Sequence, residues 1–178
     1  MYFDGVVGDL TLWRLTGLDQ IHYQPIGVVH SPYKDTTGVP IQPRAAQGIK
    51  GTVEVFDDFR EGLADLDGFS HIILIYHLHL SQGYALQVIP FLDNQLRGLF
   101  ATRAPRRPNP IGLSVVALDR IEGSILYIEG VDIVDGTPLL DIKPYVPEFD
   151  REIDIRTGWL TGKSRHTKDR LSDDRFRK

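Results

Sequence analysis

Apolar and polar residues alternate over several short stretches of the chain, and this alternation predicts β-strands. Val53 and Val55, for example, alternate with polar residues, as in a strand that buries one face. The turn Glu122-Gly123 separates two such stretches and predicts a β-hairpin. The predicted strands cover residues 21–29, 50–56, 69–80, 98–102, 111–121 and 125–131.

The stretch from Phe69 to Leu80 is the predicted core strand. Its run of isoleucine and leucine is typical of a strand that is buried on both faces. His77 and His79 would share one face, because strand side chains alternate with a period of two. Together with His71 they could hold a metal ion, which would suit a metal-dependent hydrolase. However, no carboxylate lies near them in the sequence, and histidine in a β core is more often satisfied by hydrogen bonds.

Helix signals are few. Asp57 begins a predicted short helix that ends near Leu63. Strand signals outnumber helix signals at short, regular spacing, which favours a mainly β fold whose antiparallel sheet closes or folds on itself. Residues 1–20 are predicted to be an N-terminal extension. Residues 161–178 are predicted to be a basic, mobile tail that either is merely solvated or contacts RNA.

The composition narrows the function classes. The 178 residues contain no cysteine, which excludes disulfides, thiolate metal sites and cysteine nucleophiles. The net charge of −4 argues against a globally basic nucleic-acid binder, although a local basic patch can still bind a polyanion. No apolar run approaches the roughly 20 residues of a membrane span. The first residues lack the form of a signal peptide, so a cytoplasmic protein is expected.

The segment from Phe100 to Ser114 combines three prolines with three arginines. Proline fixes its own φ angle and disfavours helix in the residue before it, so this segment is predicted to be a stiff loop that is neither helix nor central strand. Such a loop holds Arg103, Arg106 and Arg107 in fixed directions, which lowers the entropy lost on binding. The loop is therefore interpreted as an anion or ligand site, with a solvated basic turn as the alternative.

A second candidate segment runs from Asp132 to Tyr145. Asp135-Gly136 is a turn dipeptide, and Pro138 stiffens the residues after it. Asp135 is a candidate site residue, although acidic residues at such positions often only close turns. The Rossmann and P-loop phosphate-binding motifs are absent, so any anion site would have to be built from loops of this kind.

Four blocks of sequence, in the same order and spacing, resemble the TsaA/YaeB-like family, the TrmO tRNA methyltransferases. The resemblance covers residues 21–160, which are predicted to form one domain. The blocks are Ile26-Gly27 with Ser31-Pro32-Tyr33-Lys34; Phe69-Ser70-His71; Phe100-Ala101-Thr102-Arg103 with Arg107-Pro108-Asn109-Pro110-Ile111-Gly112; and Asp132-Ile133-Val134-Asp135-Gly136-Thr137-Pro138 with Asp141-Ile142-Lys143-Pro144-Tyr145.

The resemblance implies a small closed antiparallel β-barrel with short helices and long loops, usually a homodimer, that binds S-adenosylmethionine. It also implies methylation of N6 of N6-threonylcarbamoyladenosine at position 37 of tRNA, with no metal and no membrane involved. A non-catalytic S-adenosylmethionine- or RNA-binding barrel is the alternative. The implied methyl-donor contacts are Ile41, Gln42, Pro43, His79, Leu80, Arg103, Leu113, Ile133, Val134, Asp135 and Gly136.

The implied chemistry suits these residue types. Arg103 can pair bidentately with the carboxylate of the methyl donor. The modified base and tRNA carry anions as well, and the implied substrate contacts are Arg106, Arg107, Asn109, Lys143 and Tyr145. Asp135 is the first candidate for a general base and His79 the second. Many bacterial members continue into a second domain that this sequence lacks, so its contacts with tRNA are expected to differ. Leu80 also replaces a polar residue of the family pattern.

Overall fold

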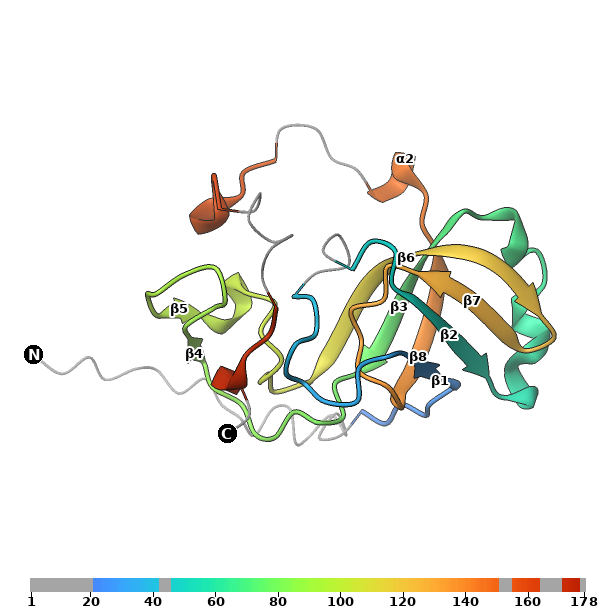
Figure 1. Cartoon of the computed structure of the whole chain (residues 1–178), viewed down its shortest axis with the longest axis horizontal. Coiled ribbons are helices and arrows are strands. Elements are labelled where there is room, and N and C mark those ends of the chain that lie inside the picture. The colour runs from blue at the N-terminus through green and yellow to red at the C-terminus, as the bar shows by residue number, and fades with distance from the viewer. Residues whose placement is uncertain (1–20, 42–45, 151–154, 164–170, 177–178) are drawn as a thin grey trace, which may run out of the picture.

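A closed antiparallel barrel of six strands forms the centre of the molecule (Figure 1). The structure, a computed structural model, describes residues 21–41, 46–150, 155–163 and 171–176. The strand order around the barrel is β1-β2-β7-β6-β3-β8, and β8 pairs with β1 to close it. The predicted mainly β fold and closed antiparallel barrel are therefore confirmed. The barrel strands are β1 (Gly27–His30), β2 (Lys50–Val55), β3 (His71–His77), β6 (Ile111–Glu122), β7 (Ile125–Glu129) and β8 (Thr137–Pro144).

The barrel core follows from the alternation of side chains along each strand. Strands β6 and β7 form the predicted hairpin, and Gly123 in its turn adopts a φ of +64°. The strands direct mostly aliphatic side chains inward, as expected for a small barrel filled by its own residues. The largest fully buried side chains of the barrel strands are Ile72, Leu74, Leu126, Ile128, Leu139, Val29, Val53 and Val116.

Strand β3 differs from the prediction in length and burial. It covers His71–His77 rather than residues 69–80, and its side chains alternate between buried and more accessible. The reason is that a barrel wall has one inner and one outer face, so only every second residue enters the core. The chain turns after His77, where Leu78 N–H donates to the carbonyl of Pro110. His79 therefore lies beyond the strand.

Three further elements differ from the sequence prediction. Strand β1 begins only at Gly27. The predicted helix at Asp57–Leu63 is a 3₁₀ helix, and Phe56 rather than Asp57 occupies the position before it. The predicted strand over residues 98–102 is instead the end of β5 followed by a 3₁₀ turn, Leu99–Ala101, because Thr102 N–H bonds back to the carbonyl of Leu99.

A small lobe, residues 81–104, interrupts the barrel between β3 and β6. It contains the two-stranded hairpin of β4 (Gln87–Val88) and β5 (Arg97–Gly98). Val88, Leu99 and Ala104 form its own apolar cluster, separate from the barrel core. We call this segment the β4–β5 lobe.

Two later segments of the chain contact the β4–β5 lobe. The Trp159 indole N–H, from the 3₁₀ turn Gly158–Leu160, donates to the carbonyl of Ala101 at 2.7 Å, and Lys163 pairs with Asp93 at 2.9 Å. The 3₁₀ turn Asp174–Phe176 near the C-terminus packs on the lobe cluster through Phe176. Residues 171–176, within the predicted tail, thus have defined contacts, while the division of the chain at residues 20 and 160 stays a prediction.

The two ends of the barrel are built differently. At one end β3 stops at His77, β6 starts at Ile111 and β8 starts at Thr137, and the loops that follow or precede these strands gather there beside the β4–β5 lobe (Figure 1). We call this the loop end. The opposite end carries the 3₁₀ helix Asp57–Leu63 and the short helix α2 (Pro147–Asp150).

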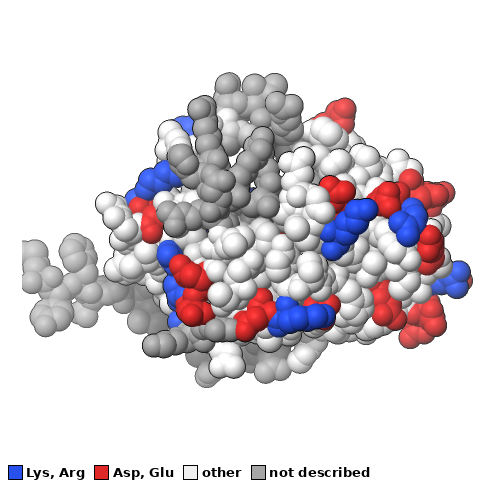
Figure 2. All heavy atoms as spheres, viewed as in Figure 1, with Lys and Arg blue, Asp and Glu red and all other residues white. Residues whose placement is uncertain are grey.

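The surface of the described residues is mixed in charge. Figure 2 shows acidic and basic side chains next to one another around the edges of this face, with a largely uncharged centre. Such a surface provides no broad positive field, so binding of a polyanion would depend on particular arginines and lysines. None of the helices that the structure describes has the length and apolar character needed to cross a bilayer.

Candidate functional site

Two adjoining hollows open at the loop end of the barrel. The first has a volume of about 290 Å³ and the second about 380 Å³. They have four lining residues in common, Tyr76, Leu78, Pro105 and Asp132. The strand ends of the barrel and the arginine–proline loop therefore build one divided site.

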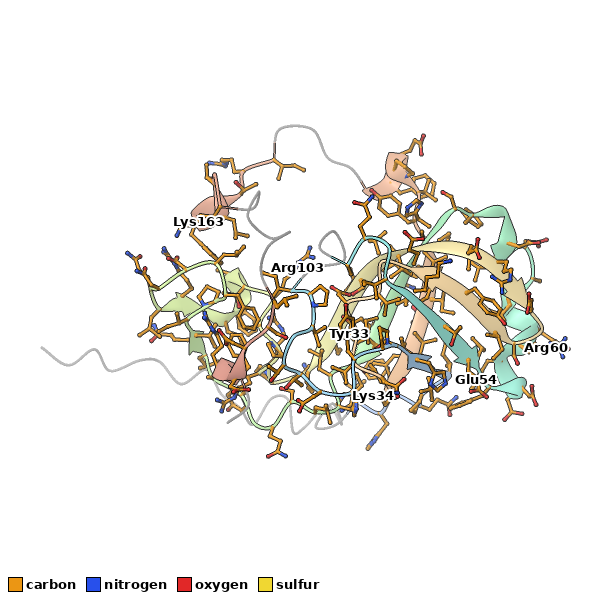
Figure 3. All side chains as sticks on the ribbon, viewed as in Figure 1. Tyr33, Lys34, Glu54, Arg60, Arg103 and Lys163 are labelled. Carbon is orange, nitrogen blue, oxygen red and sulfur yellow. The ribbon has the colours of Figure 1, made fainter. Side chains whose placement is uncertain are left out.

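The two hollows differ in charge. The first is lined by apolar residues and by Asp35, Asp132 and Asp173, of which Asp173 is paired with Arg175, and the described residues that line it include no lysine or arginine. The second is lined by Arg103 and Arg107 as well as by Asp132. In Figure 3, Arg103 lies between the barrel and the β4–β5 lobe. The first hollow thus suits an apolar cation, and the second suits an anion.

Asp132 stands between the two hollows in a hydrogen-bonded chain. The Ser114 hydroxyl donates to Oδ1 of Asp132 at 2.6 Å, and the Tyr76 hydroxyl lies 3.0 Å from Ser114 Oγ. Burial raises the pKa of Asp132 to about 6, while the Ser114 hydrogen bond and the charge of Arg103 act in the opposite direction. Burial also raises the pKa of Tyr76, which therefore stays neutral. Asp132 can hold or release a proton near neutral pH.

His79 lies in the first hollow after the end of β3. Its Nδ1 is 3.3 Å from the Thr137 hydroxyl. Burial, followed by the neighbouring His77, lowers the pKa of His79, so its imidazole is neutral at pH 7. His71 is at the other end of β3, roughly 20 Å away at the rise of a strand, so the three histidines cannot share one metal ion within a protomer. The described residues contain no cluster of three possible metal-ligating side chains.

Asp135 lies behind the first hollow, next to Val134, and is engaged by neighbouring groups. Its carboxylate accepts a hydrogen bond from the backbone N–H of Ser31 at 3.0 Å and pairs with Lys34 at 2.6 Å (Figure 3 labels Lys34). The Lys34 bond, the largest cause, lowers the pKa of Asp135. Asp135 therefore fastens the loop after β1 to the turn before β8, and it is a poorer proton acceptor than Asp132.

The turn itself forms as predicted. Gly136 adopts a φ of +77°, a conformation that L side chains rarely take, and its N–H donates to the carbonyl of Val29. This turn aligns Ile133 and Val134 along the wall of the first hollow.

The arginine–proline loop is neither helix nor strand over residues 102–110, as predicted, whereas the predicted segment begins in the 3₁₀ turn Leu99–Ala101 and ends in β6. Nη1 of Arg107 donates to the carbonyl of Thr102 at 3.0 Å, and the guanidinium lies 5.8 Å from the centre of the Phe100 ring. Arg106 is half-buried, and its Nε is a buried nitrogen with no acceptor among the described atoms. Asn109 is exposed at the tip of the loop.

The structure thus brings together most of the donor contacts that the family resemblance implies. Gly136 and Asp135 sit directly behind the wall, and Gln42 and Pro43 fall outside the described residues. The implied contacts that line the two hollows are Ile41, His79, Leu80, Arg103, Leu113, Ile133 and Val134.

Lys143 and Tyr145 are not brought to this site. They lie on and after the end of β8 that pairs with the start of β3, at the opposite end of the barrel. Lys143 forms an ion pair with Asp141 at 2.7 Å, and Tyr145 packs edge-on against His71. Within one protomer these two side chains are separated from the hollows by the length of the barrel.

The sequence reasoning missed the group with the most unusual environment, Asp132. The sequence did contain a signal for Asp132, which stands between the apolar residues Val131 and Ile133. Both neighbours are buried, and a carboxylate in such a position is rarely a simple surface group. Tyr76 and Ser114 were likewise polar residues on the inward-facing positions of predicted strands. Buried polar groups of this kind require partners, and here they are partners of one another.

The chain is similar to proteins that are named for tRNA methylation or for S-adenosylmethionine binding. The family profile described as tRNA-methyltransferase O N-terminal domain matches residues 28–151. A probable S-adenosyl-L-methionine-binding protein of Pyrococcus abyssi is 57% identical, over 86% of this chain and 83% of that protein. A mouse tRNA (adenine(37)-N6)-methyltransferase is 37% identical over 71% of this chain, but the match covers only 31% of the mouse enzyme.

Solved structures agree with the fold. The crystal structure of TrmO from Pseudomonas aeruginosa superposes with a TM-score of 0.66 at 38% sequence identity, covering 79% of this chain and 62% of that one. The match therefore extends over most of the described barrel, while more than a third of the bacterial chain has no counterpart in the alignment.

Proposed function

Because the chain belongs to the tRNA-methyltransferase O N-terminal domain family, we propose that it transfers a methyl group from S-adenosylmethionine to tRNA. The proposed acceptor is N6 of N6-threonylcarbamoyladenosine at position 37. The observation that carries the proposal is the position of Asp132, between an acidic apolar hollow and a hollow lined by arginines.

The residues present fit S-adenosylmethionine. The ligand combines an aromatic base, a sulfonium cation and a carboxylate, and the two hollows offer apolar surface, carboxylates and an arginine. Ile133, Val134 and His79 would contact its apolar and aromatic parts, and Arg103 would pair with its carboxylate. When bound, the ligand supplies a methyl group attached to a good leaving group.

In this proposal Asp132 accepts the proton that N6 loses when it gains the methyl group. Its pKa of about 6 leaves it ionised at pH 7 but basic enough to accept a proton. Ser114, which donates to one Asp132 oxygen, holds the carboxylate in place. Positioning of the two reacting groups supplies much of the remaining rate, because methyl transfer needs only an in-line approach.

Arg107 and Arg106 are proposed to bind the anions of the acceptor, with Asn109 as a further polar contact. Arg107 lines the second hollow and is braced by the carbonyl of Thr102, so it is already directed before it binds. The acceptor carries both phosphates and a threonyl carboxylate, and a guanidinium can bind either in a two-bond geometry. Lys143 and Tyr145 lie too far away to reach the same base within one protomer.

The test is methyl transfer from radiolabelled S-adenosylmethionine to two tRNA preparations, identical except for the threonylcarbamoyl group. Label is expected only in the modified tRNA, as a methylated form of that nucleoside. Tight binding of S-adenosylmethionine without transfer to a full tRNA pool would instead identify a binding module that catalyses nothing.

We also propose that the chain acts as a homodimer. Several large apolar side chains of the β4–β5 lobe are exposed, which supports a surface that is covered by a partner. These side chains are Tyr84, Leu86, Leu96 and Phe100. Sedimentation equilibrium would test this, and a monomer at micromolar concentration would contradict it.

A further inference from the structure

The C-terminal residues Leu171–Phe176 cross the first hollow from one side to the other. On one side, Leu171 forms a β-bridge with Pro40, and Ser172 bonds to the loop after β1. In Figure 1 this segment, drawn in red, runs between that loop and the β4–β5 lobe. We call residues 171–176 the C-terminal clamp.

Ser172 fastens the clamp to the loop after β1 with four hydrogen bonds. Its N–H donates to the carbonyl of Val39 at 2.8 Å, and its carbonyl accepts from the N–H of Gly38 at 2.9 Å. Its hydroxyl accepts from the N–H of Val39 and donates to the carbonyl of Thr36. Such pairing fixes both the backbone and the side chain of Ser172.

The other end of the clamp is anchored on the β4–β5 lobe. The Phe176 ring packs edge-on against Phe91, with 5.1 Å between ring centres. Nη1 of Arg175 donates to the carbonyl of Pro90 at 2.8 Å, and its guanidinium is also paired with Asp173. The clamp thus joins two loops that lie on opposite sides of the first hollow.

The clamp also supplies part of the hollow itself. Ser172, Asp173 and Phe176 line it together with Tyr76 of β3 and Asp132 of the loop before β8. Without the clamp this side of the hollow would lose an aromatic wall and a carboxylate. The loop after β1 would lose the partners of two of its N–H groups, Gly38 and Val39.

We propose that residues 171–176 complete the methyl-donor site, so that the chain closes its own ligand chamber with its C-terminal segment. The identity of the ligand rests on the proposed function. The clamp holds the two loops at a fixed separation, and Phe176 provides apolar surface for an aromatic, cationic ligand. Loss of the contacts at one end of the clamp is expected to weaken those at the other end, because only six residues connect the two.

The test uses Phe176→Ala in the full chain, with Phe149→Ala on α2 as the matched control, because Phe149 is 82% exposed and lies at the opposite end of the barrel. Hydrogen exchange of the Gly38 and Val39 amides is followed by NMR, and S-adenosylmethionine binding by calorimetry. F176A is expected to speed exchange of both amides about tenfold and to weaken binding at least fivefold, with the barrel amides unchanged. F149A is expected to change neither quantity.

The outcomes separate the clamp from the proposed function. Unchanged exchange at Gly38 and Val39 in F176A, or faster exchange with unchanged ligand affinity, overturns the clamp while leaving the proposed function intact. A wild-type chain that does not bind S-adenosylmethionine contradicts the proposed function and removes the ligand assigned to the clamp. In wild type, added ligand is expected to slow exchange at both amides, and failure to do so when binding is measured also overturns the clamp.

Discussion

The ring of Tyr76 lies directly over Gly112. A Cβ placed at residue 112 would be 2.1 Å from Cε2 of that ring, far inside contact distance. The two residues face each other across the β3–β6 pair, at the loop end of the barrel. The absence of a side chain at Gly112 therefore lets Tyr76 reach Ser114, which in turn positions Asp132.

Gly112→Ala is expected to displace the Tyr76 ring and to weaken S-adenosylmethionine binding. Forcing an extra carbon into a packed site costs about 1–3 kcal/mol, and chemical denaturation would measure the loss. Gly62→Ala is the matched control, because nothing lies within 4 Å of a Cβ at residue 62. Equal stability and equal affinity for the two variants would show that Tyr76 does not depend on Gly112.

Asp132→Asn is expected to lower the rate of methyl transfer about 10²–10⁴-fold, the usual contribution of a general base. In the wild type the single-turnover rate should rise as the pH increases through about 6, because the carboxylate must be ionised to accept a proton. That limb of the pH profile should disappear in D132N. Asp119→Asn, at an exposed position, is the control. A variant with the wild-type rate and profile would exclude Asp132 as the proton acceptor.

The Asp132 carboxyl group also makes the stability of the folded protein depend on pH. Its folded-state pKa of about 6 is above the ordinary 3.8, so the folded protein favours the protonated carboxyl. The stabilisation that the protonated Asp132 carboxyl gives to the folded state is complete below about pH 4, and it is lost as the pH rises towards 6. Between pH 4 and pH 7, urea unfolding should show the free energy of unfolding of wild type falling relative to that of D132N, because the other carboxylates contribute equally to both proteins. An equal change in both proteins would place the titration elsewhere.

Arg103→Ala is expected to weaken S-adenosylmethionine binding by about 1.5–3 kcal/mol, the range for a hydrogen bond to a charged group. Calorimetry would measure it. Arg60→Ala, at the other end of the barrel (Figure 3), removes the same charge far from the site and should have no effect. Equal losses for the two variants would point to net charge rather than to a specific contact.

Arg107→Ala is expected to act on tRNA rather than on the methyl donor. The slope of log K against log salt concentration should become shallower by about 0.7–1, as for the loss of one phosphate contact. Filter binding at several salt concentrations would give the slope, again with Arg60→Ala as the control. A wild-type slope in R107A would remove this residue from the tRNA-binding surface.

The sequence predicts the barrel well because its strands have one buried face. Residues 50–56 and 111–121 alternate cleanly, and both are strands in the structure. The continuous apolar run at residues 72–75 predicted a strand buried on both faces, which is wrong. The outer face of β3 is only half-buried, and apolar residues also suit such a face. The strand predicted over residues 98–102 is wrong for a local reason. A hydrogen bond from Thr102 to the carbonyl of Leu99 closes a 3₁₀ turn there.

The site was only partly predictable. The arginines were found because proline and arginine together are unusual, and Arg103 and Arg107 do line a hollow. Asp135 was favoured over Asp132 because a turn dipeptide is visible in sequence, whereas burial of a carboxylate depends on strands that are distant in the chain. The contribution of residues 171–176 could not be seen either, because it depends on contacts with residues 36–40 and 90–91.

The most direct test of the account compares the affinity of S-adenosylmethionine with that of its product S-adenosylhomocysteine, which lacks the sulfonium charge, from pH 5 to pH 7.5. A cation close to Asp132 should favour the ionised carboxylate, so the ratio of the two affinities should rise about 5–10-fold over this range in wild type. In D132N the ratio should stay constant. A ratio that is independent of pH in wild type, or that changes equally in both proteins, would contradict the assignment of these hollows as the methyl-donor site.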